Sequence, residues 1–279
     1  MTVSPCSLAY IGGSSTLSIR IPEDLELDFV RIVDRDLVYA TPYGESPPFQ
    51  VLEIERQGHW ERMLSCRMHG WRSGVSRANA SRQVFWVLAQ AGVKKVLAEG
   101  GVGAINHLLR PRDVIVPHDY MDFSMRKDVG LEDRYLLIMR DSLCPDMRQQ
   151  LLDYLTAHWP GRIFDRGVYA NTDGRHFESP AEINFYRMGG ADIVGQSICP
   201  EVYLAREIGA CYVGLYLVVN YAEGIISPWQ HEELQDIFYN QALEVGKTVF
   251  GFFHGLEDSP CVCADLRKET LLKEVYDKE

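Results

Sequence analysis

The chain has 279 residues, of which 46% are hydrophobic and 24% charged, a composition typical of a globular protein. This composition excludes wholesale disorder, collagen and a coiled-coil rod, and the length suits one large α/β domain or two small ones. The formal net charge is −11, so the surface repels phosphate polymers and we expect no nucleic-acid partner.

Short apolar runs with polar residues between them predict several strands at the start of the chain. These strands are expected at 7–11, 27–33, 37–40, 50–54 and 61–66. Helical periodicity then predicts a helix over 78–91 that ends at Gly92. It is followed by a strand over 95–98 that runs into the glycine-rich segment 99–103, and by a strand at 114–116.

The second half of the chain alternates helices and strands. Strands are expected at 163–170, 191–194 and 210–219, the last apolar enough to be buried on both faces of a sheet. Helices are expected at 146–158, 180–188, 200–208 and 228–253. A capping box with proline at the first helical position, Ser179-Pro180-Ala181-Glu182, begins the second of them.

This alternation predicts the α/β class. Right-handed crossovers between successive strands give a parallel or mixed sheet with helices on both faces. In such a sheet, ligands bind beyond the carboxyl ends of the strands. The residues at these ends are 12–15, 67–69, 100–103, 178 and 220.

Targeting signals are not evident in the sequence. The longest apolar run, 210–219, is shorter than the roughly 20 residues that a membrane-spanning helix needs, and the first nine residues do not resemble a signal peptide. Seven scattered cysteines do not suggest a disulfide scaffold, so we expect a cytoplasmic protein with no membrane partner. The Cys261-x-Cys263 pair would close a small strained ring if oxidised, so two thiols are expected there.

Two of the strand ends carry groups suited to an anion. The run 12–15 is Gly-Gly-Ser-Ser, which lets backbone N–H groups and the Ser14 hydroxyl approach an anion, or forms only a tight turn. Arg67 and His69 lie two residues apart on a strand and therefore point the same way. They can grip a phosphate together, or they are a surface arginine and a structural histidine.

Two further strand ends carry groups suited to a heterocyclic base. Glu178 can accept a hydrogen bond from a ring N–H, or it can act only on the dipole of the following helix. Asn220 ends the most buried strand, where its amide serves a ligand or caps a turn. No histidine has the spacing to cysteine that a zinc site requires, so no metal site is expected.

Several motifs together carry a resemblance to a known family. They are IGGS at 11–14, Arg67-x-His69, GVYANTDGRHFESPAE at 167–182, GADIVGQSICP at 190–200 and LVVNYA at 217–222. With these motifs the chain resembles the trimeric purine nucleoside phosphorylases, in the branch that includes methylthioadenosine and methylthioinosine phosphorylases. The resemblance runs in order over nearly all of residues 7–254 and is most specific over 167–224.

The resemblance implies a fold, an assembly and a reaction. The fold would be a single-domain α/β/α sandwich around a mixed, partly closed sheet, formed by residues 1–255, with 256–279 as a polar tail that holds a short helix. The assembly would be a homotrimer or a dimer of trimers. The reaction would be phosphorolysis of a purine nucleoside, with inorganic phosphate as co-substrate and no cofactor or metal.

The resemblance also implies a role for each matching residue. Asn220 would donate to the purine N7, and Glu178 would accept from the purine N1–H. With His69 these would be the catalytic residues. The phosphate would be held by Ser14, Arg67, His69, Gly101 and Ser197. The nucleoside would be bound by Phe177 stacked on the base, by Gln196 and Trp71 at the ribose, and by His231 or the pair Leu234 and Phe238 at the 5′ group.

The residue types at the base favour 6-oxopurines, because an ionised Glu178 accepts from N1–H and repels the lone pair of adenine N1. We therefore expect cleavage of inosine and guanosine, with 5′-methylthioinosine or 5′-methylthioadenosine as the alternative substrate. Gly100, Arg175 and Gln196 depart from the family pattern. These departures leave open a catalytically weak purine-nucleoside-binding relative, and a hydrolase is a third possibility.

Overall fold

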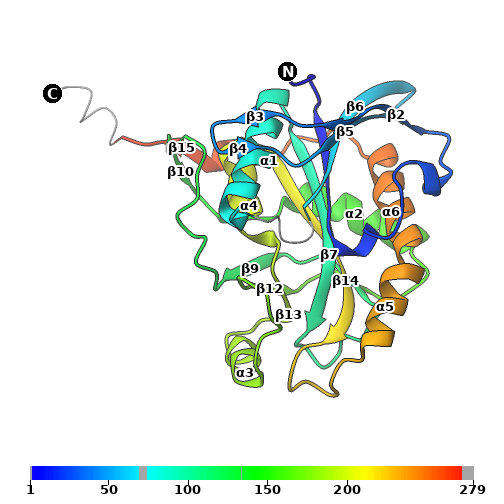
Figure 1. The fold of residues 1–279 in the computed structure, drawn as a ribbon, viewed down its shortest axis with the longest axis vertical. Helices are drawn as coiled ribbons and strands as arrows, with labels where there is room; N and C mark the ends of the chain where they lie inside the picture. The colour runs from blue at the N-terminus through cyan, green and yellow to red at the C-terminus, as the bar shows by residue number, and fades with distance from the viewer. Residues whose placement is uncertain (1, 69–73, 133, 272–279) are drawn as a thin grey trace.

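A large mixed sheet forms the centre of the protein. In the computed structural model, which describes residues 2–68, 74–132 and 134–271, eleven strands join in this sheet (Figure 1). Its main path runs β11-β8-β14-β7-β1-β6-β5-β2. A branch leaves this path at β7 and runs through β13 and β12 to β9. The sheet strands are β1 (Leu8–Gly12), β2 (Val30–Leu37), β5 (Phe49–Arg56), β6 (His59–Arg67), β7 (Lys95–Ala104), β8 (Val114–Ile115), β9 (Asp119–Asp122), β11 (Ile163–Phe164), β12 (Val168–Asn171), β13 (Ile193–Gly195) and β14 (Cys211–Tyr221).

Four neighbouring strands of the sheet, β6, β1, β7 and β14, run in parallel. β1 pairs in parallel with both β6 and β7, and β7 pairs in parallel with β14. Their carboxyl ends therefore meet at one edge of the sheet, as the sequence predicts for a ligand site. β13 pairs antiparallel with β7, which makes the sheet mixed and brings the segment that follows β13 to the same edge.

Helices cover both faces of the sheet (Figure 1). One apolar cluster joins the sheet to α1 (Arg77–Ala91) and α4 (Ile198–Glu207), and a second joins it to α2 (Pro145–His158) and α6 (Ala242–Gly255). The remaining helices are α3 (Pro180–Met188) and α5 (His231–Asn240), with short 3₁₀ helices η1 (Ser14–Thr16), η2 (Glu23–Leu25) and η3 (Cys263–Leu266). The predicted α/β fold with a mixed sheet is confirmed.

The start and end of two helices follow their sequence signals. Ser179 accepts from the Glu182 backbone N–H, and the Glu182 carboxylate accepts from Ser179 in return, so the predicted capping box begins α3. α1 ends at Gly92, whose φ of 78° is the left-handed conformation that glycine adopts most easily. In the described residues no helix is long and apolar enough to cross a membrane.

The strand expected at 95–98 is longer than predicted, because β7 continues through the glycine-rich segment 99–103 to Ala104. The glycines in it permit close packing. A Cβ at Gly101 would lie 3.0 Å from both Ser14 Oγ and a Val219 methyl, and a Cβ at Gly103 would lie 3.1 Å from a Val194 methyl. Glycine therefore lets side chains from three other segments reach the β7 backbone.

Other boundaries differ because the chain changes partner. The strand expected at 163–170 is two strands, since β11 pairs with β8 whereas β12 pairs with β9 and β13. The helix expected at 228–253 is two helices that meet at Gln241, so that α6 packs under the sheet while α5 reaches the functional end. The strand expected at 37–40 is absent, because β2 itself extends to Leu37 and Ala40 belongs to a separate hairpin of β3 (Ala40–Thr41) and β4 (Gly44–Glu45).

The C-terminal segment returns to the body of the protein. After Gly255 it forms η3 and then β15 (Arg267–Glu269), which pairs antiparallel with β10 (Tyr135–Leu137). Arg206 lies under this segment and donates to the backbone carbonyl of Cys263 at 3.1 Å. The part of this segment from η3 onward is thus attached to α4.

Candidate active site

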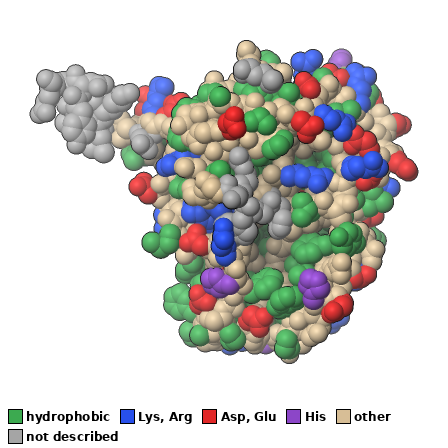
Figure 2. Space-filling model, viewed as in Figure 1, with side chains coloured by type: hydrophobic (Ala, Val, Ile, Leu, Met, Phe, Trp, Pro, Cys, Tyr) green, Lys and Arg blue, Asp and Glu red, His purple; other side chains and the backbone are tan. Residues whose placement is uncertain are grey.

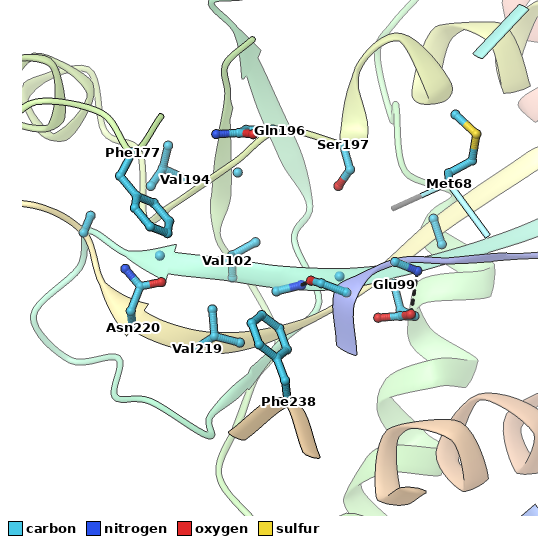
Figure 3. A pocket seen from close by; sticks show the side chains of 18 of the residues that line it. Met68, Glu99, Val102, Phe177, Val194, Gln196, Ser197, Val219, Asn220 and Phe238 are labelled. Carbon is cyan, nitrogen blue, oxygen red and sulfur yellow. Dashed lines mark hydrogen bonds between the residues drawn. The ribbon is translucent and has the colours of Figure 1, made fainter. Parts of the chain in front are cut away.

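A cavity of about 470 Å³ lies at the carboxyl ends of β1, β7 and β14 (Figure 3). This volume is within the range of sites for small organic ligands. Five other segments complete its wall: the residue after β6, the start of α1, the loop 175–178, the segment 194–201 from β13 into α4, and helix α5. On the face shown in Figure 2, acidic and basic side chains alternate over the described surface without a single-sign patch. The site therefore suits a small ligand better than a charged polymer.

Most of the predicted site residues come together in this cavity. Its lining contains Ser14, Gly101, Phe177, Glu178, Gln196, Ser197, Asn220, Leu234 and Phe238. They come from six separate segments, and Figure 3 shows Phe177 and Asn220 at one end with Ser197 further along. The cavity thus joins the groups expected at the base with two of the hydroxyls expected at the phosphate.

The other four predicted residues are two that the structure does not describe and two that it places outside this lining. His69 and Trp71 lie outside the described residues. Arg67 is exposed, and its guanidinium donates to the backbone carbonyls of Leu17, at 3.1 Å, and Ile19. His231 is exposed at the first residue of α5. In this conformation, backbone carbonyls use the Arg67 guanidinium that the sequence analysis assigned to phosphate.

The two serines lie on either side of the glycines of β7. The Gly101 backbone N–H donates to Ser14 Oγ at 2.8 Å, which holds that hydroxyl at the cavity wall. A Cβ at Gly100 would lie 3.7 Å from Ser197 Oγ, so this second hydroxyl faces the neighbouring glycine. Ser197 Oγ also lies 3.3 Å from the Tyr169 hydroxyl. Two hydroxyls at the glycine-rich part of a strand form a small polar end to the cavity.

Two backbone N–H groups of the glycine loop after β1 donate to a carboxylate of the protein itself and not to the cavity. Instead, the carboxylate of Glu99 accepts from Gly13 N–H at 2.6 Å and from Ser15 N–H at 3.2 Å. It also accepts from the hydroxyls of Thr16, at 2.7 Å, and Tyr10, at 3.2 Å. Burial raises the pKa of Glu99, and these four donors act against that shift. The loop is therefore held in shape by an internal carboxylate.

The base end of the cavity is built around Glu178, whose side chain is only 5% exposed. Its Oε1 accepts from the Thr172 hydroxyl at 2.5 Å and from Gln196 Nε2 at 3.4 Å. Both contacts use the same oxygen. Among the described residues none is seen to donate to Oε2, so this oxygen remains available to a ligand. Gln196 is itself placed by Gly174, where a Cβ would lie 1.9 Å from the Gln196 side-chain oxygen.

Asn220 and Phe177 complete the base end (Figure 3). Asn220 is 6% exposed, and its Nδ2 donates one hydrogen to the backbone carbonyl of Tyr221 at 2.7 Å. The second hydrogen on Nδ2 remains for a ligand. Phe177 packs against Trp229 with ring centroids 4.9 Å apart, and Trp229 donates to the Glu223 carboxylate at 3.0 Å. An aromatic platform, an acceptor and a donor therefore line one end.

Three charged residues of the lining, Arg77, Glu201 and Glu223, were not predicted from the sequence. Burial and the charge of Arg126 lower the pKa of Arg77 to about 10, which leaves it cationic at neutral pH. Arg77 is the first residue of α1, where the helix dipole disfavours a cation. This mismatch was the one local signal in the sequence that Arg77 has a role beyond helix formation. Arg175, at a φ of 72° in the loop 175–178, is a second cation in the lining.

Glu201 gives a pH-dependent prediction. Burial raises the pKa of its carboxyl from 4.5 to about 7, although the Tyr212 hydroxyl donates to it at 2.9 Å. The folded protein therefore holds this proton more tightly than the unfolded chain does. The resulting stabilisation is complete below pH 4.5 and is lost as the pH rises through 7, by roughly 3 kcal/mol.

The variant Glu201→Gln stays neutral and should not show this loss. Urea unfolding of both proteins at pH 5 and pH 8 measures it. We expect the free energy of unfolding of the natural protein to fall by roughly 2.5 kcal/mol more than that of the variant between these pH values. If the free energy of unfolding falls equally in both proteins, Glu201 is not protonated in the folded protein at pH 5.

Comparisons with known proteins all find phosphorylases. A model described as the phosphorylase superfamily matches residues 39–253. A protein of Methanopyrus kandleri named probable S-methyl-5′-thioinosine phosphorylase is 39% identical over 197 residues, 69% of this chain and 74% of that protein. One of Korarchaeum cryptofilum named probable 6-oxopurine nucleoside phosphorylase is 29% identical over 95% of this chain and 98% of its own length. The crystal structure of a methylthioadenosine phosphorylase from an antarctic soil metagenomic library has the same fold, with a TM-score of 0.72 at 21% identity over 94% of this chain and 91% of that one.

Proposed function

The chain belongs to the phosphorylase superfamily, and we propose that it cleaves the N-glycosidic bond of 6-oxopurine nucleosides with inorganic phosphate. The products are free hypoxanthine or guanine and ribose 1-phosphate, so the enzyme is a pentosyltransferase. The observation that carries the proposal is the single cavity that joins Glu178 and Asn220 with Ser14 and Ser197. The relatives named 6-oxopurine nucleoside phosphorylase and thioinosine phosphorylase support the same base class.

The base end is matched to a 6-oxopurine. Glu178 Oε2 accepts from N1–H, a proton that a 6-oxopurine has and adenine lacks. Thr172 and Gln196 hold the carboxylate through its other oxygen, so it cannot turn away from the base. Phe177 offers a ring face to the purine, and the second N–H of Asn220 Nδ2 points to N7. Gln196 then lies between the base and the phosphate, where the ribose would be.

The reaction separates charge, and the two ends of the cavity stabilise the two parts. As the bond from C1′ to N9 lengthens, the ribose becomes positive and the purine negative. A phosphate oxygen attacks C1′ and forms the new C–O bond, while the electron pair of the broken bond remains on the purine. Asn220 stabilises this negative charge by donating to N7. Holding phosphate and nucleoside in one cavity also removes the cost of a bimolecular encounter.

The phosphate lies against Ser14, Ser197 and the glycines of β7 in this proposal. Arg77 supplies positive charge at the cavity wall, and the roles of Arg67 and His69 at the phosphate stay predictions from the resemblance. Because Glu99 already accepts from the Gly13 and Ser15 N–H groups, the phosphate relies on hydroxyls and guanidinium groups more than on a backbone nest. Trimeric assembly, a role in purine salvage and a cytoplasmic location remain predictions from the resemblance and the composition.

The experiment that tests the proposal is a base-release assay with and without phosphate. The chain is incubated with inosine, guanosine, adenosine, 5′-methylthioinosine and 5′-methylthioadenosine, and the free base is measured. We expect release from the 6-oxopurine nucleosides only, and only when phosphate is present. Release that ignores phosphate would identify a hydrolase. No release from any of the five would identify a binding protein.

A second candidate substrate, 5′-methylthioinosine, is favoured by the helix α5. Its residues Leu234 and Phe238 line the cavity, whereas His231, which could serve a 5′-hydroxyl, does not. A Cβ at Gly101 would lie 3.2 Å from the Phe238 ring, so this ring lies beside the phosphate end, where the 5′ group of a nucleoside would come. Two apolar side chains suit a methylthio group better than a hydroxyl.

The variant Phe238→Ser separates the two substrates. We expect the ratio of kcat/KM for methylthioinosine over inosine to fall by about 10- to 100-fold, since the lost contacts are apolar. Tyr239→Ser is the matched control, because Tyr239 is the next residue of α5 and is 63% exposed. If the ratio moves equally in both variants, α5 does not form the pocket for the 5′ group.

A further inference from the structure

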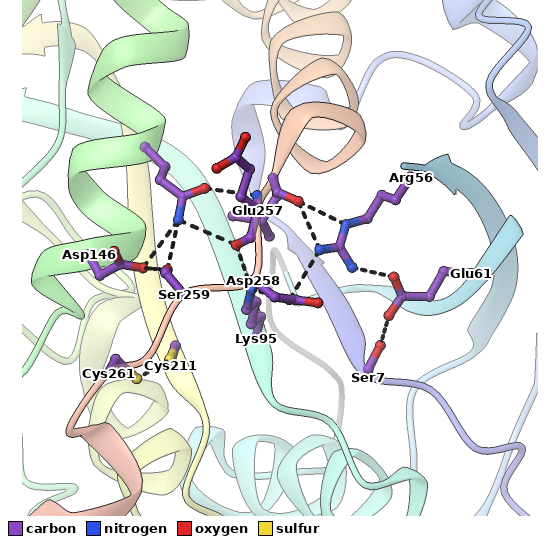
Figure 4. Close-up of polar contacts among 12 residues, drawn as sticks. Ser7, Arg56, Glu61, Lys95, Asp146, Cys211, Glu257, Asp258, Ser259 and Cys261 are labelled. Atoms are coloured by element: carbon purple, nitrogen blue, oxygen red, sulfur yellow. Dashed lines mark hydrogen bonds and ion pairs between the residues drawn. The ribbon is translucent and has the colours of Figure 1, made fainter. Parts of the chain in front are cut away.

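Four cysteines meet at one point of the fold, away from the cavity. They are Cys144, Cys211, Cys261 and Cys263, and all four sulfur atoms lie within 4.8 Å of one another. The Sγ atoms of Cys211 and Cys261 are 3.0 Å apart (Figure 4). None of the four residues belongs to the cavity lining. The cluster therefore needs an explanation that the proposed reaction does not supply.

The four thiols come from three parts of the chain. Cys144 precedes the first turn of α2, and Cys211 is the first residue of β14. Cys261 and Cys263 belong to the C-terminal segment. Cys144, Cys211 and Cys263 are buried and Cys261 is exposed, so the cluster lies just under the surface. This arrangement leaves a short path from solvent to four sulfur atoms.

Polar contacts before the cluster hold the C-terminal segment in place (Figure 4). The Glu257 backbone N–H donates to Gln150 at 2.9 Å, and Lys95 pairs with Asp258 at 2.7 Å. Ser259 donates to Asp146 in the first turn of α2. These contacts come from α2 and β7, the elements beside Cys144 and Cys211, so Cys261 and Cys263 are brought to the other two thiols by groups other than sulfur.

We propose that Cys144, Cys211, Cys261 and Cys263 bind one divalent zinc-like metal ion in a closed tetrahedral site. With metal–sulfur bonds of about 2.3 Å, the four sulfur atoms of such a site are about 3.8 Å apart, so the cluster needs only small side-chain movements to reach it. Each thiol releases its proton to solvent as its sulfur–metal bond forms. Four protein ligands leave no open position, so the site is structural.

The surroundings suit this site. Four thiolates and one divalent cation carry a net charge of −2. The guanidinium of Arg206, only 2% exposed, donates to the backbone carbonyls of Cys263 at 3.1 Å and Asp141 at 2.6 Å, so a buried cation lies beside two of the ligand-bearing segments. Bound metal would fasten residues 256–271 to α2 and β14. No metal site was expected from the sequence, because no histidine has a zinc-site spacing to a cysteine; the four cysteines themselves come from three segments that are remote from one another in the chain.

The test is a titration of the full-length, fully reduced chain with Co²⁺ in the absence of other metals. Tetrahedral thiolate-bound Co²⁺ has visible and sulfur-to-metal charge-transfer absorption. We expect it to saturate at one ion per chain and to vanish when Zn²⁺ is added. A chain purified anaerobically should also carry about one zinc ion by elemental analysis.

Cysteine variants locate the site. Cys144→Ser, Cys211→Ser and Cys263→Ser should each weaken Co²⁺ binding by more than about 100-fold, whereas Cys6→Ala, a buried cysteine outside the cluster, should not. If the variants fail to fold, the Co²⁺ titration of the unaltered chain still tests whether the site exists. Reduced chain without thiolate-bound cobalt, or chain isolated with these four sulfur atoms joined as disulfides, would overturn the proposal.

Discussion

The variant Asn220→Asp is expected to lower kcat/KM for inosine by about 10²- to 10³-fold, because it replaces the amide donor by an acceptor of the same shape. Asn220 is nearly buried in the cavity wall, and one of its two Nδ2 hydrogens is already used by the Tyr221 carbonyl. The other is the group proposed to meet N7. Since negative charge develops on the purine only as the bond breaks, the loss should fall mainly on kcat.

Steady-state kinetics on inosine at saturating phosphate measures this effect. Asn240→Asp is the matched control, because Asn240 is an exposed amide at the end of α5 that does not line the cavity. Thermal unfolding of both variants shows whether they are folded. If Asn220→Asp keeps the turnover of the natural protein, Asn220 does not contact the leaving purine.

The variant Glu178→Ala is expected to lower kcat/KM for inosine and guanosine by about 10²-fold, the effect of losing a hydrogen bond to a charged group. The variant should not gain activity on adenosine, because no donor for adenine N1 is introduced. Loss of the carboxylate also frees the Thr172 hydroxyl and Gln196 Nε2, which lie at 2.5 and 3.4 Å from it. KM and kcat should therefore both change.

Glu232→Ala provides the comparison for this variant, since Glu232 is an exposed carboxylate in the first turn of α5. The measurement is kcat/KM for inosine, guanosine and adenosine with each protein. Unchanged discrimination between inosine and adenosine in Glu178→Ala would mean that Glu178 does not read the purine N1. The base assignment would then have to move to another cavity residue.

Local sequence signals predicted the elements that depend on short-range chemistry. The capping box at Ser179 and the glycine stop at Gly92 each depend on residues within one helix turn, so the sequence alone contains them. The apolar run 210–219 became β14 because a strand between two neighbours needs apolar side chains on both faces. The rule that ligands bind at the carboxyl ends of parallel strands then placed Ser14, Glu178 and Asn220 in one cavity.

Features that depend on distant partners were not predictable in this way. Glu99 was predicted only to follow a strand, but its carboxylate organises the loop after β1, from which it is more than eighty residues away in sequence. The last helix divides at Gln241, because α5 packs against β14 whereas α6 packs against β5 and α2. The four clustered cysteines were treated as scattered thiols, since only the folded sheet brings Cys144 and Cys211 to the C-terminal segment.

The most direct test of the account is a crystal structure of the protein with inosine and sulfate, an anion that resembles phosphate but cannot complete the reaction. The account predicts sulfate in contact with the Ser14 and Ser197 hydroxyls. It also predicts hypoxanthine with N1 within hydrogen-bond distance of Glu178 and N7 within that distance of Asn220. A purine bound outside this cavity, or a sulfate remote from both serines while the nucleoside is bound, would contradict it.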